Sequence, residues 1–235
     1  MKAILLAAGV GTRIINDIGQ MPKSMVDVGG QPLIVHTVEL LMKNNMDVVI
    51  ITGFKHRVIE DALKDYPVKV YYNPFYAVTN SIGSLWYARD ELNTSEVFIA
   101  NADVYYTQEM LDIVFAADKD VFLLSDVTRA ESGDYYFYTN NGVLEKYGKE
   151  LTRGERNCEY VGMGVVKNGW VGLFKDRLCD LIESGSYNLW WENVLYSFVG
   201  EKPVYTVDVD GCFWSEVDTI DDYKRVLEYI GKASE

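Results

Sequence analysis

The chain has 235 residues, 49% of them apolar, which is enough to form one large hydrophobic core without disulfides or structural metal ions. Its 35 acidic and 22 basic residues give a net charge of −13, and a surface this negative repels a phosphate backbone, so nucleic acid is not expected as a partner. Three widely spaced cysteines form neither a disulfide framework nor a zinc motif, and they indicate reduced thiols and a cytoplasmic location.

The start of the chain, MKAILLAAGVGTR, is interpreted as a buried strand rather than a signal peptide. Gly9, Gly11 and Arg13 interrupt its apolar run. No later segment holds the roughly 18 uncharged apolar residues that a membrane helix needs, so no membrane association is expected.

Over the first half of the chain, short apolar runs alternate with segments of helical period. We expect strands at 2–7, 47–53, 68–72, 97–100 and 121–125, and helices from Pro32 and at 56–66, 82–92 and 108–117. Uniformly apolar strands that are joined by helices predict a parallel sheet with helices on both faces.

From Asp134 onward the pattern becomes antiparallel, because YYFYTNNGVLEKY resembles two strands joined by an Asn-Gly turn. Beyond it we expect strands at 160–167, 204–208 and 213–217, the last two returning to the sheet, and helices at 170–184, at 188–199 and at the C-terminus. The predicted fold is a Rossmann-like α/β sandwich with a mixed, mostly parallel sheet and a small inserted substrate lobe. We expect one domain over residues 1–235, with a nucleotide-binding half to about residue 130 and an acceptor-binding half from about residue 131.

A loop of small residues follows the first strand in LAAGVGTR. Small side chains let backbone N–H groups approach a phosphate closely, Arg13 can bind two phosphate oxygens as a fork, and Lys23 adds a second positive charge. In a chain of net charge −13, this local positive charge predicts a polyphosphate site. The alternative is an ordinary tight turn between a strand and a helix.

LAAGVGTR, followed by PKSMVDVGGQPLI, resembles the signature of the nucleotidyltransferases that make nucleotide-activated sugars and alcohols. The resemblance implies that the loop surrounds the triphosphate, with Arg13 and Lys23 stabilising charge on the α-phosphate and on the departing pyrophosphate. Asn16 and Ile18 depart from the family pattern, which usually has Pro and Thr there. The expected nucleotide-binding residues are Leu6, Ala7, Ala8, Gly9, Gly11, Thr12, Arg13, Lys23, Asn80, Ser84, Ala102 and Asp103.

Two aspartates at strand ends are candidates for a Mg²⁺ site. Mg²⁺ prefers carboxylate oxygens together with substrate phosphates. Asp103 ends an apolar strand and Asp218 closes a later one, although each alone is also typical of a helix cap or a turn. The resemblance implies that both hold the metal and that they form the catalytic set with Arg13 and Lys23. Glu216 lies on the same strand face as Asp218 and is either an alternative ligand or a supporting residue.

The segment NPFYAVTNSIGSL, residues 73–85, is predicted to be a loop that leads into a helix at Ser81. It resembles the base-binding segment of choline-phosphate and related cytidylyltransferases, which implies that Asn80 and Ser84 face a cytosine. Helix capping by Asn80 or Ser81 is the alternative.

NLWWEN, residues 188–193, places two tryptophans beside a glutamate on a predicted helix, where adjacent side chains cannot both face the core. An exposed ring beside a carboxylate suits a cationic ammonium group, whereas packing in the core or at a homodimer interface is the alternative. Resemblance to the choline-phosphate enzymes favours an amino alcohol phosphate or an aminoalkyl phosphonate as acceptor, and related sugar enzymes keep a lysine for the acceptor phosphate at the position of Lys149. The expected acceptor-binding residues are Tyr135, Lys149, Trp190, Trp191, Glu192 and Trp214. Tyr135, Tyr136 and Trp214 are candidates to complete an aromatic cage around the ammonium group with the exposed tryptophan.

The sequence therefore predicts a Mg²⁺-dependent cytidylyltransferase that transfers CMP from CTP to phosphocholine and releases pyrophosphate. Rival acceptors are 2-aminoethylphosphonate, a phosphorylated amino acid or amide, inositol phosphate, and hexose 1-phosphate with another nucleotide. A catalytically silent nucleotide sensor is a further hypothesis, and the presence of both Asp103 and Asp218 argues against it. An NAD-dependent oxidoreductase is disfavoured, because no acidic residue lies in the right context about 20 residues past the loop.

Overall fold

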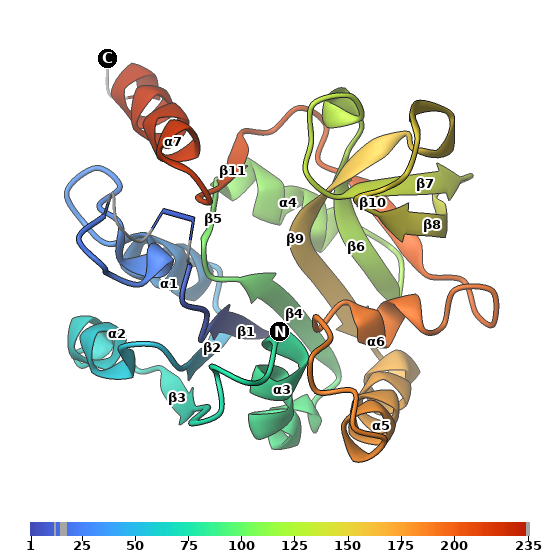
Figure 1. Cartoon of the computed structure of the whole chain (residues 1–235), viewed down its shortest axis with the longest axis horizontal. Helices are drawn as coiled ribbons and strands as arrows, with labels where there is room; N and C mark the ends of the chain where they lie inside the picture. Colours follow the sequence, from blue (N-terminus) through green and yellow to red (C-terminus); the bar gives the residue numbers. More distant parts are fainter. Residues whose placement is uncertain (12, 15–17, 234–235) are drawn as a thin grey trace.

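A mixed sheet of nine strands forms the centre of the protein, in a computed structural model that describes residues 1–11, 13–14 and 18–233 (Figure 1). The strands lie side by side in the order β3-β2-β1-β4-β9-β6-β10-β8-β7. Their bounds are β1 Lys2–Ala7, β2 Asp47–Thr52, β3 Lys69–Tyr72, β4 Glu96–Asn101, β6 Val121–Asp126, β7 Tyr136–Asn140, β8 Val143–Gly148, β9 Cys158–Lys167 and β10 Tyr205–Asp208. The predicted mixed α/β sheet is confirmed, but it is not mostly parallel: among the described strands of this sheet, four pairings are parallel and five are antiparallel, because β9 inserts antiparallel between β4 and β6.

Parallel pairing is concentrated in the first half of the chain. β1 pairs in parallel with β2 and β4, and β2 pairs in parallel with β3. β9 then lies antiparallel between β4 and β6, while β10 runs parallel to β6. Because β1 and β4 are parallel neighbours, their carboxyl ends lie at the same edge of the sheet, and the loops that follow them meet there.

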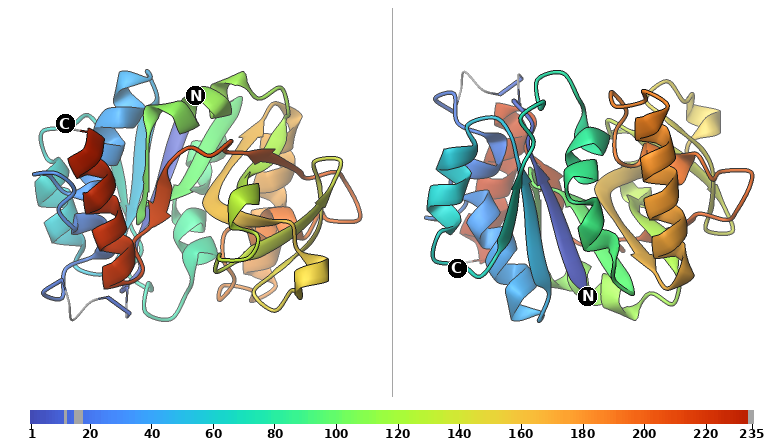
Figure 2. Two further views of the ribbon diagram at one scale, coloured as in Figure 1. Left: turned by 90° about the horizontal axis from the view of Figure 1, so that it is seen from above. Right: turned by 90° about the horizontal axis from the view of Figure 1, so that it is seen from below.

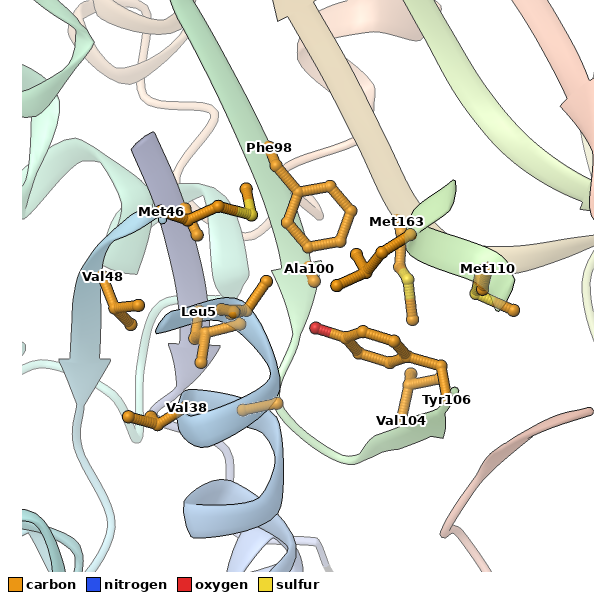
Figure 3. Packing of buried hydrophobic residues seen from close by; sticks show 14 of the residues in the cluster. Leu5, Val38, Met46, Val48, Phe98, Ala100, Val104, Tyr106, Met110 and Met163 are labelled. Carbon is orange, nitrogen blue, oxygen red and sulfur yellow. The ribbon is translucent and has the colours of Figure 1, made fainter. Parts of the chain in front are cut away.

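Helices cover both faces of the sheet (Figure 2). Successive side chains of β1 point to opposite faces of the sheet. Leu5 belongs to one hydrophobic cluster, with Val38, whereas Ile4 belongs to a second cluster on the opposite face, with Leu85 and Leu178. Figure 3 shows the first cluster, in which Leu5 lies close to side chains from the neighbouring strands and helices. The α-helices are α1 Leu33–Lys43, α2 His56–Leu63, α3 Ser81–Tyr87, α4 Gln108–Ala116, α5 Gly169–Glu183, α6 Asn193–Tyr196 and α7 Ile220–Ala233.

A second, two-stranded sheet pairs β5 Val104–Tyr106 antiparallel with β11 Trp214–Glu216. The sequence placed 213–217 back in the main sheet and did not indicate β5, so this prediction was wrong. β10 already has β6 and β8 as neighbours, which leaves no free edge beside it for β11. β5 is only three residues long, too short to show a period of two.

The expected helix at 188–199 is reduced to α6, Asn193–Tyr196, and this prediction was also wrong. The backbone N–H of Trp190 donates to the Asn193 side chain (3.0 Å), and that of Trp191 donates to the Ser81 hydroxyl (2.9 Å). These donors are used for side-chain contacts instead of a helical ladder. The segment 188–192 is therefore a turn that precedes α6.

The predicted Asn-Gly hairpin is confirmed between β7 and β8, where Asn141 and Gly142 both have positive φ (50° and 73°), as a two-residue type I′ turn requires. The helix expected at 82–92 divides into α3 and a short 3₁₀ helix, Arg89–Leu92. Within the described residues, no helix has the length and apolar character needed to span a bilayer.

Candidate active site

A cavity of about 600 Å³ opens at the carboxyl ends of β1 and β4. Of the predicted nucleotide-binding residues, it is lined by Leu6, Ala7, Ala8, Gly9, Gly11, Arg13, Lys23, Asn80, Ser84, Ala102 and Asp103. Thr12, and the family departure at Asn16, lie outside the described residues. The structure therefore gathers the described members of this set around one space.

The loop after β1 depends on glycine where it passes Lys23. Gly11 has a φ of +65°, and a Cβ atom there would lie 2.5 Å from Cγ of Lys23. Any larger residue would therefore strain the backbone and displace the lysine. Lys23 begins the short 3₁₀ helix Lys23–Met25, directly after Pro22.

Ion pairs join the predicted phosphate-binding cations to the predicted metal-binding acids. Nη1 of Arg13 lies 2.6 Å from Oδ2 of Asp218. Nζ of Lys23 lies 3.3 Å from Oδ2 of Asp103 and also contacts Oδ1 of Asp218. The two cations thus offset the charge of these two carboxylates.

The two-stranded sheet brings the acids together from distant parts of the chain. Asp103 directly precedes β5, and Asp218 follows β11 by two residues. The backbone N–H of Val217 donates to the carbonyl of Asp103 (2.9 Å), which fixes the two segments against each other. Carboxylate oxygens of Asp103, Glu216 and Asp218 all lie within 4.8 Å of one another.

This group of acids fits a hard divalent cation. Three carboxylates supply oxygen ligands of the kind that Mg²⁺ prefers. Burial, together with the charge of Asp103, raises the pKa of Glu216 to about 8. Carboxylates so close together repel one another, and a bound cation would relieve that repulsion. Glu216 belongs to the same cluster as the two predicted ligands.

A second part of the cavity, the acceptor end, is where the predicted acceptor-binding residues Tyr135, Trp190 and Glu192 lie, and it holds a buried carboxylate among aromatic rings. Glu192, only 4% exposed, accepts hydrogen bonds from the Tyr160 hydroxyl (2.9 Å) and from the Asn101 amide (3.4 Å). Burial raises the pKa of Glu192 to about 7, although these hydrogen bonds act in the other direction. Tyr135 and Trp190 also line the cavity, with ring centroids 5.4 Å apart.

Lys149 also lines the cavity. Its Nζ pairs with Oδ2 of Asp134 at 2.5 Å, and both residues line the cavity. An acceptor phosphate that bound Lys149 would therefore have to compete with Asp134.

Three of the expected cage residues do not line the cavity. Trp191 is fully buried, packs against Gly164, and donates from Nε1 to Asn101 (3.2 Å). Trp214 is buried beneath the acids, and Tyr136 is covered by the guanidinium of Arg156. Of the two adjacent tryptophans only Trp190, 40% exposed, reaches the cavity.

The predicted base-binding residues line the cavity and are also used inside the protein. Asn80 is the N-cap residue of α3, and its side chain accepts from the Ser81 N–H (2.8 Å). Ser84 is buried, and its hydroxyl accepts from the Asn73 amide (3.0 Å). The capping alternative is therefore present in the structure without removing either residue from the cavity wall.

Sequence reasoning missed several cavity residues, among them Asn101, Tyr160 and Tyr196. Asn101 ends β4 two residues before Asp103, and its position at a strand end was a usable signal. Tyr160 lies within β9, where the sequence indicated only a strand. No local pattern marks Tyr196, because its approach to the cavity depends on how α6 packs.

Comparisons with known proteins agree with this arrangement. Residues 3–157 match the model of the MobA-like NTP transferase domain. The chain is 28% identical to the choline-phosphate cytidylyltransferase of Streptococcus pneumoniae over 241 residues, which cover 98% of each chain.

Two solved structures share the fold. The CTP:phosphocholine cytidylyltransferase of Streptococcus pneumoniae has a TM-score of 0.81 at 23% identity, covering 97% of this chain and 98% of that chain. The inositol-1-phosphate CTP transferase of T. maritima has a TM-score of 0.79 at 24% identity, covering 100% of this chain and 96% of that chain. The predicted fold class is thereby confirmed.

Proposed function

This chain belongs to the MobA-like NTP transferase family and is a nucleotidyltransferase, and we propose that it transfers CMP from CTP to a small phosphorylated acceptor with a cationic end. Phosphocholine is the first candidate. CTP is proposed because the similar enzymes named above use it and because Asn80 and Ser84 line the cavity where their segment resembles the base-binding segment of cytidylyltransferases.

The observation that carries the choice of acceptor is the buried carboxylate of Glu192 beside the rings of Tyr135, Tyr160 and Trp190. Within the described part of the chain, the side chain of Glu192 accepts hydrogen bonds from the neutral groups of Asn101 and Tyr160, and neither supplies a positive charge. A quaternary ammonium group would supply that partner and would also be attracted to the aromatic faces. A sugar hydroxyl would satisfy neither the charge nor the rings as well.

The reaction needs no protein nucleophile. An oxygen of the acceptor phosphate attacks the α-phosphorus of CTP, a new phosphorus–oxygen bond forms, and the bond from the α-phosphorus to the bridging oxygen breaks as pyrophosphate leaves. In this proposal Arg13 and Lys23 bind the triphosphate and offset the charge that develops on the leaving group. Lys149 holds the acceptor phosphate in line.

Asp103 and Asp218, with Glu216 beside them, are proposed to hold Mg²⁺. The ion would supply neutralisation of phosphate charge when bound. The protein's own contribution is to keep these acids within reach of the loop after β1, through the pairing of β5 with β11.

The test follows pyrophosphate release from the purified protein with each nucleoside triphosphate and a panel of acceptors. The decisive pair is phosphocholine and 3,3-dimethylbutyl phosphate, which has the same shape but no positive charge. We expect CTP with phosphocholine to give the highest kcat/KM, about tenfold or more above the neutral analogue.

Three outcomes would contradict the proposal at different levels. Faster turnover of a hexose 1-phosphate or inositol phosphate would replace the acceptor. Equal turnover of phosphocholine and its neutral analogue would remove the role proposed for Glu192. Binding of CTP in calorimetry without metal-dependent turnover of any acceptor would make the protein a nucleotide sensor.

A further inference from the structure

A buried cluster of three side chains joins the main sheet to the two-stranded sheet. Nε1 of Trp214 donates to Oδ2 of Asp126 at 2.8 Å, and both residues are 2% exposed. The guanidinium of Arg129 stacks on the Trp214 ring, with Cζ 4.1 Å from its centroid, and donates to the Trp214 carbonyl at 2.7 Å. Nε of Arg129 also lies 3.4 Å from Oδ2 of Asp126, so each of the three side chains contacts the other two.

The members of this cluster come from elements with different attachments. Asp126 is the last residue of β6 in the main sheet, and Arg129 lies in the 3₁₀ turn that follows it. Trp214 is the first residue of β11, two residues before Glu216 and four before Asp218. The cluster therefore fixes the start of the strand that delivers two of the three acids.

The cluster lies beside the acids, and its three members are not among the residues that line the main cavity. A second hollow of about 440 Å³ is lined by Trp214 and Arg129 together with Glu216 and Asp218. Trp214 is 2% exposed and does not line the main cavity, so its side chain offers almost no surface for direct contact with nucleotide or acceptor. Its polar contacts all secure the position of β11.

We propose that Trp214 is a positioning residue for the metal site, and that Asp126 and Arg129 hold it in place. The inference rests on the proposed metal-binding role of Asp103 and Asp218. β11 is only three residues long, so its pairing with β5 alone constrains the acids weakly. A shift of one residue would turn Glu216 to the opposite face of the strand. Fixing both the side chain and the carbonyl of Trp214 opposes that shift.

The test compares Trp214→Phe with Trp191→Phe. Trp191 is a matched control, because it is equally buried and its Nε1 also donates one hydrogen bond, but to Asn101 at the acceptor end. Mn²⁺ is titrated into each protein, without and with CTP, and free Mn²⁺ is followed by electron paramagnetic resonance. We expect Trp214→Phe to raise the Mn²⁺ dissociation constant roughly 5- to 50-fold, and Trp191→Phe to change it by less than about twofold.

A second variant protects the test against a general loss of folding. Arg129→Met removes the bond to the Trp214 carbonyl while keeping an unbranched apolar stem, and it should weaken Mn²⁺ binding in the same direction. Thermal melting of all three variants shows whether the loss of Mn²⁺ affinity merely follows the loss of stability. Equal Mn²⁺ affinities in wild type and Trp214→Phe, or equal weakening by Trp191→Phe, would overturn the positioning role.

Failure of the underlying metal site gives a different result. If the wild-type protein binds no Mn²⁺ with or without CTP, both the metal site and the role of Trp214 are wrong. If it binds Mn²⁺ but turns over no cytidine pair, the proposed substrates are wrong, while the comparison of Trp214→Phe with Trp191→Phe still decides the inference.

Discussion

The two ends of the cavity neutralise charge in different ways. At the end formed by the loop after β1 and by β11, Asp103 and Asp218 pair with Lys23 and Arg13. At the acceptor end, the side chain of Glu192 accepts hydrogen bonds from the neutral donors of Tyr160 and Asn101 among the residues that the structure describes.

The difference indicates which ligand each end requires. The first end holds cations and acids together, and it suits a ligand that carries both signs, such as a triphosphate with a divalent cation. At the acceptor end Glu192 lacks a cationic partner in its hydrogen bonds, and its pKa is raised to about 7 mainly by burial. A cation bound there would stabilise the ionised carboxylate.

The largest effect on activity is expected at the end of the cavity that holds Asp103, Glu216 and Asp218. Asp103→Asn should lower kcat at least about 100-fold, because it removes a fixed negative charge where cation and phosphates meet. Stability should change little, because the loss of the ion pair with Lys23 is offset by weaker repulsion of Glu216, whose pKa is raised by burial and by the charge of Asp103. Pyrophosphate release and thermal melting test this, with the exposed Asp47→Asn as control. Full activity of Asp103→Asn would remove this residue from the site.

A smaller effect, in two opposite directions, is expected for Lys23→Met. Loss of the ammonium should weaken CTP binding roughly tenfold. It should also strengthen Mn²⁺ binding in the absence of nucleotide, because Lys23 contacts both aspartates and repels a second cation. Calorimetry with CTP and Mn²⁺ titration separate the two effects. Lys146→Met is the control, since neither Lys146 nor its partner Glu155 lines the cavity or belongs to the acid cluster. Weaker Mn²⁺ binding by Lys23→Met would contradict the charge-balance argument.

At the acceptor end, Glu192→Gln should raise the KM for phosphocholine about tenfold near pH 8 and leave the KM for CTP unchanged. Because the pKa of Glu192 is about 7, the carboxylate gains its charge as pH rises through 7. The KM of the wild type should therefore fall from pH 6 to pH 8 beyond any change seen with the neutral analogue 3,3-dimethylbutyl phosphate. Glu192→Gln should lose that difference. The same slope in both proteins would assign the titration to the substrate phosphate.

The same contrast explains how much the sequence revealed. Charged residues at strand ends could be placed, because an apolar strand fixes where its last residue emerges, and Asp103 follows directly from β4. The pairing of Asp103 with Asp218 could be expected only from the family resemblance. This pairing is produced by the strands β5 and β11. Each has only three residues, which is too few to show the alternation of a strand in the sequence.

Aromatic residues were harder to place. The rule that two neighbouring helical side chains cannot share a buried face predicted one exposed tryptophan, and one is exposed, but the segment is a turn rather than a helix. Which ring points inward depends on the space beside Gly164, where the Trp191 ring fits. Such packing is set by residues far apart in the chain, so composition and spacing could not separate Trp190 from Trp191.

The smallest effect on activity, with a measurable effect on stability, is expected at Glu91. This acid lies outside the cavity and, like Asp218, is paired with basic side chains. Glu91 accepts from Lys2 (2.5 Å) and Tyr71 (2.6 Å) and contacts Lys69. Burial alone would raise its pKa, but these partners lower it from 4.5 to about 2. A depressed folded-state pKa stabilises the protein above the unfolded value of 4.5, and this contribution is lost as pH falls toward 2.

Glu91→Gln should therefore lower the free energy of unfolding by about 1 to 3 kcal/mol near pH 7, a range that allows for solvent screening at the exposed Lys69. The deficit should shrink as the pH is lowered from about 5 toward 2, which urea unfolding at several pH values can follow. Turnover should stay within about twofold of the wild type, because Glu91 does not line the cavity. A deficit independent of pH would mean that lost packing, not the ion pairs, sets the cost. Together with Asp103→Asn, this variant separates a balanced acid that supports the fold from one that supports the reaction.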